Sequence, residues 1–463
     1  MKKFVVVGGG TAGWLSALYV QKNIPYSKVT VIASSEIGVL GAGEGTTKNF
    51  SEFLENDLGL DFNDVIKKCK ITIKNAIKFT NWNGDGTSYF HSAISSTEDI
   101  SIAAAKENKV LFDYNNQRIR HNGILTEDSV HFNAMIMADY LKGVAIQRGI
   151  EYIDAQVTEI IPNDKNDISE LVLSNNQKIK LDFVFDCSGF KKLIIGNFYK
   201  ATWHSYADFL PVNRAMPFFL PHDNENIPSY TESIGMKHGW AWKIPVQDRF
   251  GCGYVFDSNL ATDEEIKKEL EEYFGVEVIP PKIFNFNAGC YEKTWINNCI
   301  AIGLSSGFAE PLEATAIGIS IMSLRMLQAK INGMGRHKHQ QSIDEYNNAV
   351  RQLNEENSCF VHLHYMTKRT DTVFWRNFKN KNTIPDLVKN VIEFGEKLTE
   401  KDLDYLIRIM PTNKVTDYLR PLDFKDWKYV MAGIGIIKPL QVKNLDTSHL
   451  QDHADFIRKK VES

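Results

Sequence analysis

A glycine-rich turn near the N-terminus limits what this chain can fold into more than any other feature. The apolar run Lys3–Val7 is typical of a buried parallel strand, and Gly8, Gly10 and Gly13 follow it as G-x-G-x-x-G. A helical run and a second apolar run, Val29–Ala33, come next. This order predicts a βαβ unit whose glycines let a dinucleotide pyrophosphate approach a helix N-terminus. The alternative is a glycine-rich turn without a ligand.

The second predicted strand lacks the acidic residue that usually holds the ribose of a dinucleotide. Ala33 occupies that position, and Glu36 follows a little further along. Glu36 is therefore the candidate substitute. The alternative is that the adenosine end is held loosely, which would suit a protein that takes up a diffusing cofactor.

Three later loops are candidates for the rest of a cofactor site. They are the glycine-rich loop Gly41–Thr47, the loop Asp186–Phe190 after the apolar run Leu181–Phe185, and the loop Ser305–Ala316 after the apolar run Cys299–Gly303. The last of these precedes a predicted helix, so its free N–H groups and the helix dipole favour an anion. Glu313 lies in this loop and is a candidate site residue. The alternative is that Glu313 is an ordinary acidic residue in the first turn of the helix.

Composition excludes several classes of function. The 463 residues are 43% hydrophobic, which allows a large core, and a net charge of −4 gives no basic face for nucleic acid. The six cysteines include no C-x-x-C pair, and His362 and His364 have no cysteine or acidic cluster beside them in the sequence. We therefore expect reduced thiols, no metal site and a cytoplasmic protein. No apolar run reaches membrane-spanning length.

Two tryptophans lie one residue apart in the stretch Gly239–Pro245. If the stretch is a strand, Trp240 and Trp242 point to the same face, and Pro245 ends or edges that strand. Two large rings on one face can form a wall of a cavity. The simpler interpretation is an aromatic patch in a sheet core.

Lysines alternate with apolar residues over Lys70–Phe79. A single strand would place Lys70, Lys74 and Lys78 on one face and the isoleucines largely on the other. From this pattern alone, the expected structure is a half-solvated strand with its lysines in water.

Taken together, the motifs resemble the flavin-dependent tryptophan halogenases, in family order and over most of the chain. The matching stretches are GGGTAGW (Gly8–Trp14), GAGEGT (Gly41–Thr46), Lys74 to Phe79-x-x-Trp82, DCSGF (Asp186–Phe190), GWAWKIP (Gly239–Pro245), RFGCGYVF (Arg249–Phe256), NCIAIGLSSGFAEPLEAT (Asn298–Thr315) and RTDTVFWR (Arg369–Arg376). The W-x-W-x-I-P element is the most specific to the family.

The resemblance implies a reaction and roles for particular residues. A separate flavin reductase supplies reduced FAD, which with oxygen and chloride or bromide gives hypohalous acid. The acid passes from the flavin to Lys74, while Lys78 is a nearby lysine without this role. Glu313 stabilises the cationic ring of the substrate and takes its proton. The remaining implied residues are Gly8, Gly10, Thr11, Ala12, Gly13, Glu36, Ala42, Glu44, Gly303 and Leu312 for FAD, Thr315 and Ala316 for halide, and His91, Trp240, Trp242 and Pro311 for the tunnel and substrate.

The implied fold is α/β, a Rossmann-like FAD module of the glutathione-reductase and hydroxylase type with an inserted, largely helical substrate region. We expect the module in residues 1–48, 140–200 and 285–330, and the substrate region in 49–139, 201–284 and 331–463. The chain reads as helical from about Ile317 onward. A homodimer is compatible with the sequence.

Two departures from the family pattern bear on the substrate. Ala93 stands two residues after His91, where a phenylalanine is expected, and Asp402 to Trp427 shows no clear equivalent of the Tyr-Tyr and Glu residues that grip free tryptophan. A more open pocket for indoles or other electron-rich aromatics is the better expectation. The alternatives are a flavin-dependent aromatic monooxygenase and a flavin-binding protein that has lost its chemistry.

Overall fold

The predicted βαβ unit forms the middle of a mostly parallel sheet. The computed structural model describes residues 2–38, 44–93, 98–122, 124–126, 129–222, 225–333, 339–380, 383–410, 422–440 and 445–462. Its six-stranded sheet has the order β10-β2-β1-β14-β23-β22, with β1 (Lys2–Val7), β2 (Ser27–Ala33), β10 (Glu151–Asp154), β14 (Phe183–Asp186), β22 (Trp295–Ile296) and β23 (Cys299–Ala301). All neighbours except β22 and β23 run parallel. The four strands that the sequence predicts are therefore confirmed, as is the Rossmann-like module.

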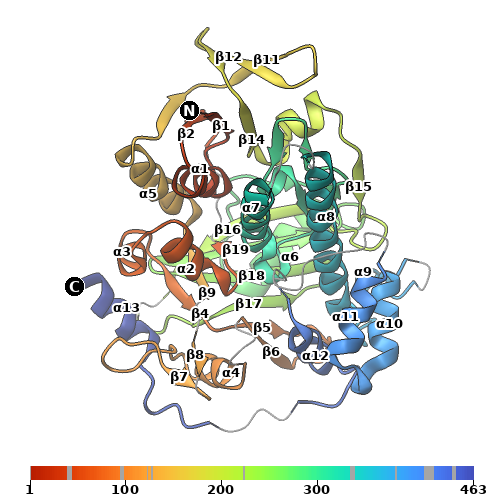
Figure 1. The fold of residues 1–463 in the computed structure, drawn as a ribbon. Helices are drawn as coiled ribbons and strands as arrows, with labels where there is room; N and C mark the ends of the chain where they lie inside the picture. Colours follow the sequence, from red (N-terminus) through yellow and green to blue (C-terminus); the bar gives the residue numbers. More distant parts are fainter. Residues whose placement is uncertain are drawn as a thin grey trace.

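A second, mixed sheet of seven strands lies below the first in the view of Figure 1. Its order is β20-β16-β19-β18-β17-β5-β6, with β5 (Ala76–Thr80), β6 (Ser88–Ser92), β16 (Arg214–Leu220), β17 (Tyr230–Gly235), β18 (Gly239–Val246), β19 (Arg249–Phe256) and β20 (Phe284–Asn285). The inserted region is thus less helical than expected. Its central strands are buried on both faces, so they lack the clean alternation that marks a half-buried strand.

Four smaller sheets complete the described strands. They comprise β3 (Glu44–Gly45), β4 (Thr72–Lys74) and β9 (Ser129–Phe132); β11 (Val157–Pro162), β12 (Ile168–Leu173) and β13 (Lys178–Lys180); β15 (Trp203–Ser205), β21 (Gly289–Tyr291) and β24 (Gly307–Phe308); and β7 (Arg120–His121) with β8 (Ile124–Leu125). The hairpin of β11 and β12 projects from the top of the molecule in Figure 1.

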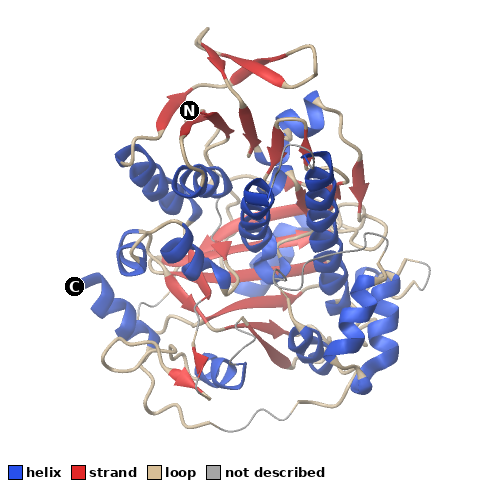
Figure 2. Cartoon of the chain, in the orientation of Figure 1, coloured by secondary structure: helices blue, strands red, loops and turns tan. Residues whose placement is uncertain are grey.

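Helices surround both sheets, and the long helical part of the chain begins where the sequence predicts it. The helices are α1 (Thr11–Asn23), α2 (Asn49–Glu52), α3 (Phe62–Lys68), α4 (Glu98–Lys106), α5 (Ala134–Gln147), α6 (Asp263–Phe274), α7 (Thr315–Gly333), α8 (His339–His364), α9 (Val373–Asn377), α10 (Asp386–Phe394), α11 (Glu400–Arg408), α12 (Phe424–Gly433) and α13 (His453–Glu462). Figure 2, read with the labels of Figure 1, shows α7 and α8 in front of the mixed sheet and α9 to α12 gathered on one side of it, whereas α13 lies on the other side. The core around α1 joins Leu18, Val31, Leu141 and Leu324.

The single alternating strand predicted over Lys70–Phe79 is wrong. Asn75 divides it into β4 and β5, which belong to different sheets. The Asn75 side chain donates to the carbonyl of Lys109 at 2.7 Å, and its backbone N–H donates to the carbonyl of Ser229 at 2.7 Å. This break turns Lys74 inward, where its exposed fraction is 1% rather than that of a solvated lysine.

The expected division of the chain remains a proposal that the sheets support. Every strand of the mostly parallel sheet comes from residues 1–48, 140–200 or 285–330. All six cysteines are buried and free. Among the residues with described positions, none of the helices combines the length and the apolar character that a membrane crossing requires.

Candidate active site

The turn between β1 and α1 has the shape that a pyrophosphate requires. A Cβ on Gly8 would lie 2.1 Å from the carbonyl oxygen of Cys187, and one on Gly13 would lie 2.0 Å from that of Gly8, so neither position admits a side chain. Gly10, the N-cap of α1, faces open space and offers no side-chain cap. The buried hydroxyl of Thr11 has no hydrogen-bond partner. Free donors at an uncapped helix start fit a phosphate group.

The other expected cofactor residues take different positions. Gly303 lies against the first turn of α1, because a Cβ on it would lie 2.7 Å from that of Ala12. Leu312 is buried, three residues before Thr315 in the sequence. Glu36 is exposed after β2 and accepts a hydrogen bond from Gln156 at 3.3 Å. Glu44 lies in β3, where burial raises the pKa of its carboxyl to about 7. Ala42 lies outside the described residues.

Lys74, at the end of β4, reaches toward the glycine-rich loop that precedes it by about thirty residues in the sequence. Its Nζ donates to the carbonyl of Thr46 at 3.1 Å. Burial lowers the pKa of its ammonium, Glu313 partly opposes this effect, and the result is about 8. Near neutral pH, Lys74 can therefore exchange between ammonium and amine, whereas an exposed lysine stays charged.

Lys74, His91 and Glu313 line one small cavity, although they come from β4, β6 and the turn before α7. The remaining lining residues are Thr46, Thr47, Lys48, Ile77, Ser92, Ala93, Leu422 and Asp426. Lys78 lies elsewhere, paired with Glu232 at 3.3 Å. The cavity therefore brings together three of the residues that the sequence singles out.

Glu313 occupies a strained position. Its φ is 67° and that of Ala314 is 53°, a left-handed pair without glycine. Such backbone costs free energy and persists where the surrounding structure requires it, often at functional sites. Glu313 is therefore not the ordinary first-turn acid that the sequence also allowed, and its exposed fraction is only 7%.

Two histidines hold the Glu313 carboxylate. Nδ1 of His91 lies 3.0 and 3.1 Å from its two oxygens, and Nε2 of His364 lies 2.8 Å from Oε1. Nε2 of His91 also lies 3.2 Å from Oδ1 of Asp426 on α12. His364 has no acidic cluster beside it in the sequence, and this carboxylate comes from a part of the chain 51 residues away.

The protonation states of this cluster depend on one another. Burial favours neutral His91, but the charge of Glu313 and hydrogen bonds to Asp426 and Glu313 outweigh it and raise the pKa of the imidazole to about 10. Burial likewise opposes ionisation of Glu313, but His91 and His364 hold the pKa of its carboxyl well below the ordinary value. Burial raises the pKa of Asp426, and His91 partly offsets this. Glu313 is therefore an anion throughout the working pH range.

The three side chains of the cluster are in direct contact, each histidine with the carboxylate. The ligand atoms of His91, Glu313 and His364 lie within 4.8 Å of one another, a spacing that an ion would need. However, the separations of 2.8 and 3.0 Å between them are those of direct hydrogen bonds. Two ligand atoms at metal–ligand distances of roughly 2.1 Å would lie further apart.

The tryptophan pair forms an aromatic wall, which we define as Trp82, Trp240 and Trp242. As predicted, Trp240 and Trp242 share a face of β18, with ring centroids 6.2 Å apart, and Trp82 lies 6.3 Å from Trp240. Ala241 faces the core on the opposite side. The strand continues one residue past Pro245, which lies beyond the part paired with β17. None of the wall residues, nor Pro311, lines the cavity around Lys74.

A second buried glutamate fixes this wall. Oε1 of Glu310 accepts hydrogen bonds from the indole of Trp240 at 3.1 Å and from the hydroxyl of Tyr365 at 2.7 Å. Its other oxygen is buried without a partner. Burial raises the pKa of its carboxyl to about 8, so Glu310 is mainly neutral at pH 7. Glu310 and Glu313 are therefore close in sequence but differ in charge, since Glu310 is mainly neutral and Glu313 is ionised.

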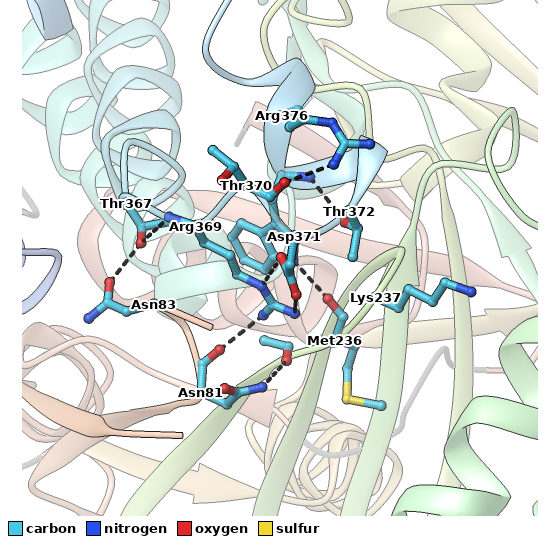
Figure 3. A network of polar contacts seen from close by, with 12 residues as sticks. Asn81, Asn83, Met236, Lys237, Thr367, Arg369, Thr370, Asp371, Thr372 and Arg376 are labelled. Atoms are coloured by element: carbon cyan, nitrogen blue, oxygen red, sulfur yellow. Dashed lines mark hydrogen bonds and ion pairs between the residues drawn. The ribbon is translucent and has the colours of Figure 1, made fainter. Parts of the chain in front are cut away.

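The stretch Arg369–Arg376 contacts the wall through Trp375, and Figure 3 shows the polar contacts that hold this stretch in place. The Arg369 guanidinium donates to the carbonyl of Asn81 at 3.0 Å and to both carboxylate oxygens of Asp371. It also lies 4.6 Å from the ring centroid of Trp375, which in turn contacts Trp82 at 5.3 Å. This stretch thus has a structural role next to the wall.

We expect Arg369→Ala to lower the free energy of unfolding by about 2 kcal/mol or more, because Arg369 is buried and several partners lose their donor together. Urea denaturation would measure the loss. Arg376→Ala is the matched control, since Arg376 is exposed and donates to the carbonyl of Thr370. A change below about 0.5 kcal/mol is expected there. Equal effects of the two changes would contradict the role of Arg369.

The start of α7 lies beside the glycine-rich loop. Thr315 is buried at the first position of the helix, and Ala316 follows it. A Cβ on Gly318 would lie 2.7 Å from the hydroxyl oxygen of Thr47, which is buried without a partner. An unpartnered hydroxyl next to the first turn of a helix is compatible with an anion at this place.

Three residues of the site carry no clear signal in the sequence: His364, Asp426 and Glu310. Asp426 has the appearance of an ordinary N3 acid, because it forms a capping box with Asp423. Its contact with His91 spans 335 residues of sequence. Only the tertiary fold reveals such a partner.

Comparison with known proteins supports a single relationship. The family model described as "Tryptophan halogenase" matches residues 3–448. Tryptophan 7-halogenase RebH of Lentzea aerocolonigenes is 30% identical over 420 residues, covering 81% of this chain and 78% of that protein. Tryptophan 6-halogenase SttH of Streptomyces toxytricini is 30% identical over 482 residues, covering 94% and 90%.

The fold has matching relatives among solved structures. The crystal structure of SttH superposes with a TM-score of 0.84 at 27% identity, covering all of this chain (100%) and 96% of that one. A tryptophan halogenase from Shewanella frigidimarina has the same fold, with a TM-score of 0.87 at 23% identity and coverage of 100% and 98%. The similarity therefore extends over the whole chain.

Proposed function

The chain belongs to the tryptophan halogenase family and is a flavin-dependent halogenase, and we propose that it halogenates an electron-rich, indole-type aromatic by means of Lys74 and Glu313. One observation carries the choice of residues: both side chains line the same buried cavity. The relatives give no support to the alternative of an aromatic hydroxylase.

FAD is the cofactor that such an enzyme requires, and the β1–α1 turn fits its pyrophosphate. Gly8, Gly10 and Gly13 leave the space, and Thr11 with the first N–H groups of α1 supplies unused donors. Reduced FAD bound there would supply the electrons with which oxygen and halide give hypohalous acid. We propose that a separate flavin reductase delivers the reduced form.

Lys74 is proposed to present the halogen to the substrate. Its ammonium donates a hydrogen bond to the oxygen of hypohalous acid, which makes the halogen more electrophilic. The ring carbon attacks the halogen, the oxygen–halogen bond breaks, and the leaving hydroxide takes a proton from Lys74 to become water. In the amine form, which a pKa of about 8 makes accessible, Lys74 could instead carry the halogen as a haloamine.

Glu313 is proposed to act on the cationic ring that results. Its carboxylate interacts electrostatically with the Lys74 ammonium, and it stabilises the positive ring in the same way. The ring proton then leaves to Glu313, and the electron pair of the broken C–H bond restores aromaticity. Transfer of this proton back to the Lys74 amine returns both groups to their starting states.

The aromatic wall and the start of α7 have supporting roles in this proposal. Trp240 and Trp242 separate the flavin side from the cavity, so that only the small oxidant passes. Backbone N–H groups of Thr315 and Ala316 hold the halide, with support from the unpartnered Thr47 hydroxyl.

The cavity lining favours a substrate other than free tryptophan. Ala93, in place of a phenylalanine, lines the cavity with Ser92 and Ile77. A small side chain at this position leaves room for substituted indoles or other electron-rich aromatics.

Incubation with a flavin reductase, NADH, FAD, oxygen and either chloride or bromide tests this proposal. We expect mass spectrometry to detect halogenated products from members of an indole panel, with free tryptophan converted less efficiently. Hydroxylated products alone, or no product from any electron-rich aromatic, would contradict it. Omission of the halide is the control, because product formation should then stop.

A further inference from the structure

Asp426 lies behind His91 and is held in a fixed orientation. It is the third residue of α12, and its Oδ2 accepts the backbone N–H of Asp423 at 2.7 Å. Its Oδ1 is thereby left to face Nε2 of His91 at 3.2 Å. One carboxylate thus joins the start of α12 to the cavity.

His91 lies between two carboxylates. Both oxygens of Glu313 contact Nδ1, and an oxygen of Asp426 contacts Nε2. An ionised carboxylate only accepts hydrogen bonds, so both contacts are satisfied when His91 carries a proton on each nitrogen. The exposed fractions of His91, Asp426 and Glu313 are 2%, 5% and 7%, so water screens their charges weakly.

We propose that Asp426 is a positioning residue that acts through His91 to keep Glu313 ionised and correctly oriented during halogenation. The inference rests on the proposed function for the role of Glu313. The Asp426 charge retains the second proton of His91, and the positive imidazolium then stabilises the Glu313 carboxylate. Removal of the Asp426 charge should weaken both effects in turn.

Other charged and titratable groups face the same cluster. Lys74 on β4, Tyr89 on β6 and His364 on α8 interact with Glu313, and Asp423 acts on Asp426 from the start of α12. All four remain in an Asp426→Asn variant. The variant therefore changes one charge and keeps the shape of the side chain.

In Asp426→Asn, His91 should lose its second proton at a lower pH, and above that pH Glu313 loses its positively charged partner. As the pH rises, halogenation should therefore fall earlier, and the alkaline limb of the kcat profile should move down by about one pH unit. KM should change less than about twofold, because substrate contacts remain. The matched control is Asp423→Asn, which removes a nearby charge that does not contact His91 and retains a helix cap. It should leave the limb near its wild-type position.

Histidine-selective NMR gives a readout that needs no substrate. The His91 signal can be assigned by its loss in His91→Asn, and wild-type His91 should remain an imidazolium at about pH 8. An unchanged His91 titration in Asp426→Asn, or a neutral wild-type His91 at that pH, would overturn the inference. The wild-type measurement decides even if the variant fails to fold. If the titrations behave as expected but wild-type protein forms no halogenated product, the proposed function fails and the link between Asp426 and His91 stands.

Discussion

Lys74→Ala should abolish halogenation, with a loss of about 1000-fold or more, while reduced FAD is still oxidised by oxygen at the wild-type rate. The reason is the position of Lys74, whose Nζ lies in the cavity rather than at the β1–α1 turn. Product formation by mass spectrometry and oxygen uptake, measured on the same sample, would separate the two steps. Halogenation that survives in this variant would remove Lys74 from the mechanism.

The structure offers a matched control four residues along the chain. Lys78 is half-buried, and its ammonium pairs with Glu232 and lies outside the cavity. Lys78→Ala should therefore retain most of the halogenation activity. An equal loss in both variants would indicate that the effect of Lys74→Ala arises from general damage to the fold.

Glu313→Gln should lower kcat for halogenation by roughly 100-fold or more, because an amide neither stabilises a cationic ring nor accepts its proton. Single-turnover halogenation at pH 7 would measure the loss. Lys74 should also titrate at a lower pH in this variant, since the Glu313 charge now raises the pKa of its ammonium. A kcat close to wild type would contradict the role of Glu313.

Glu310→Gln is the control for this change. Glu310 is equally buried, but its pKa of about 8 leaves it mainly uncharged at pH 7, so an amide resembles its native state. The amide oxygen can still accept from Trp240 and Tyr365. We expect a much smaller loss than in Glu313→Gln. The comparison thus isolates charge at nearly the same place in the sequence.

Local sequence was sufficient to predict the cofactor module. Gly8, Gly10 and Gly13 are needed by the backbone of a single short turn, so the pattern is visible within a few residues. The strands on either side are short apolar runs with clear ends. The shared face of Trp240 and Trp242 could also be predicted, because side chains alternate along any strand. These features depend on neighbours in the sequence.

The protonation network could not be predicted in the same way. Its members come from β6, the turn before α7, α8 and α12, and no short pattern records that these elements meet. His364 has the appearance of a helical histidine and Asp426 that of a cap. The burial of Lys74 was missed for a related reason: its alternation with Ile73 and Ile77 hides the break at Asn75.

The break at Asn75 also determines which sequence changes this region can tolerate. Because side chains alternate along a strand, deletion of Ile73 would rotate Lys74 out of the cavity while leaving the composition nearly intact. Variant libraries aimed at new substrates should therefore vary side chains such as Ile77 and Ala93 and preserve the length of the segment before Asn75. Insertions and deletions there are expected to yield folded, inactive enzymes.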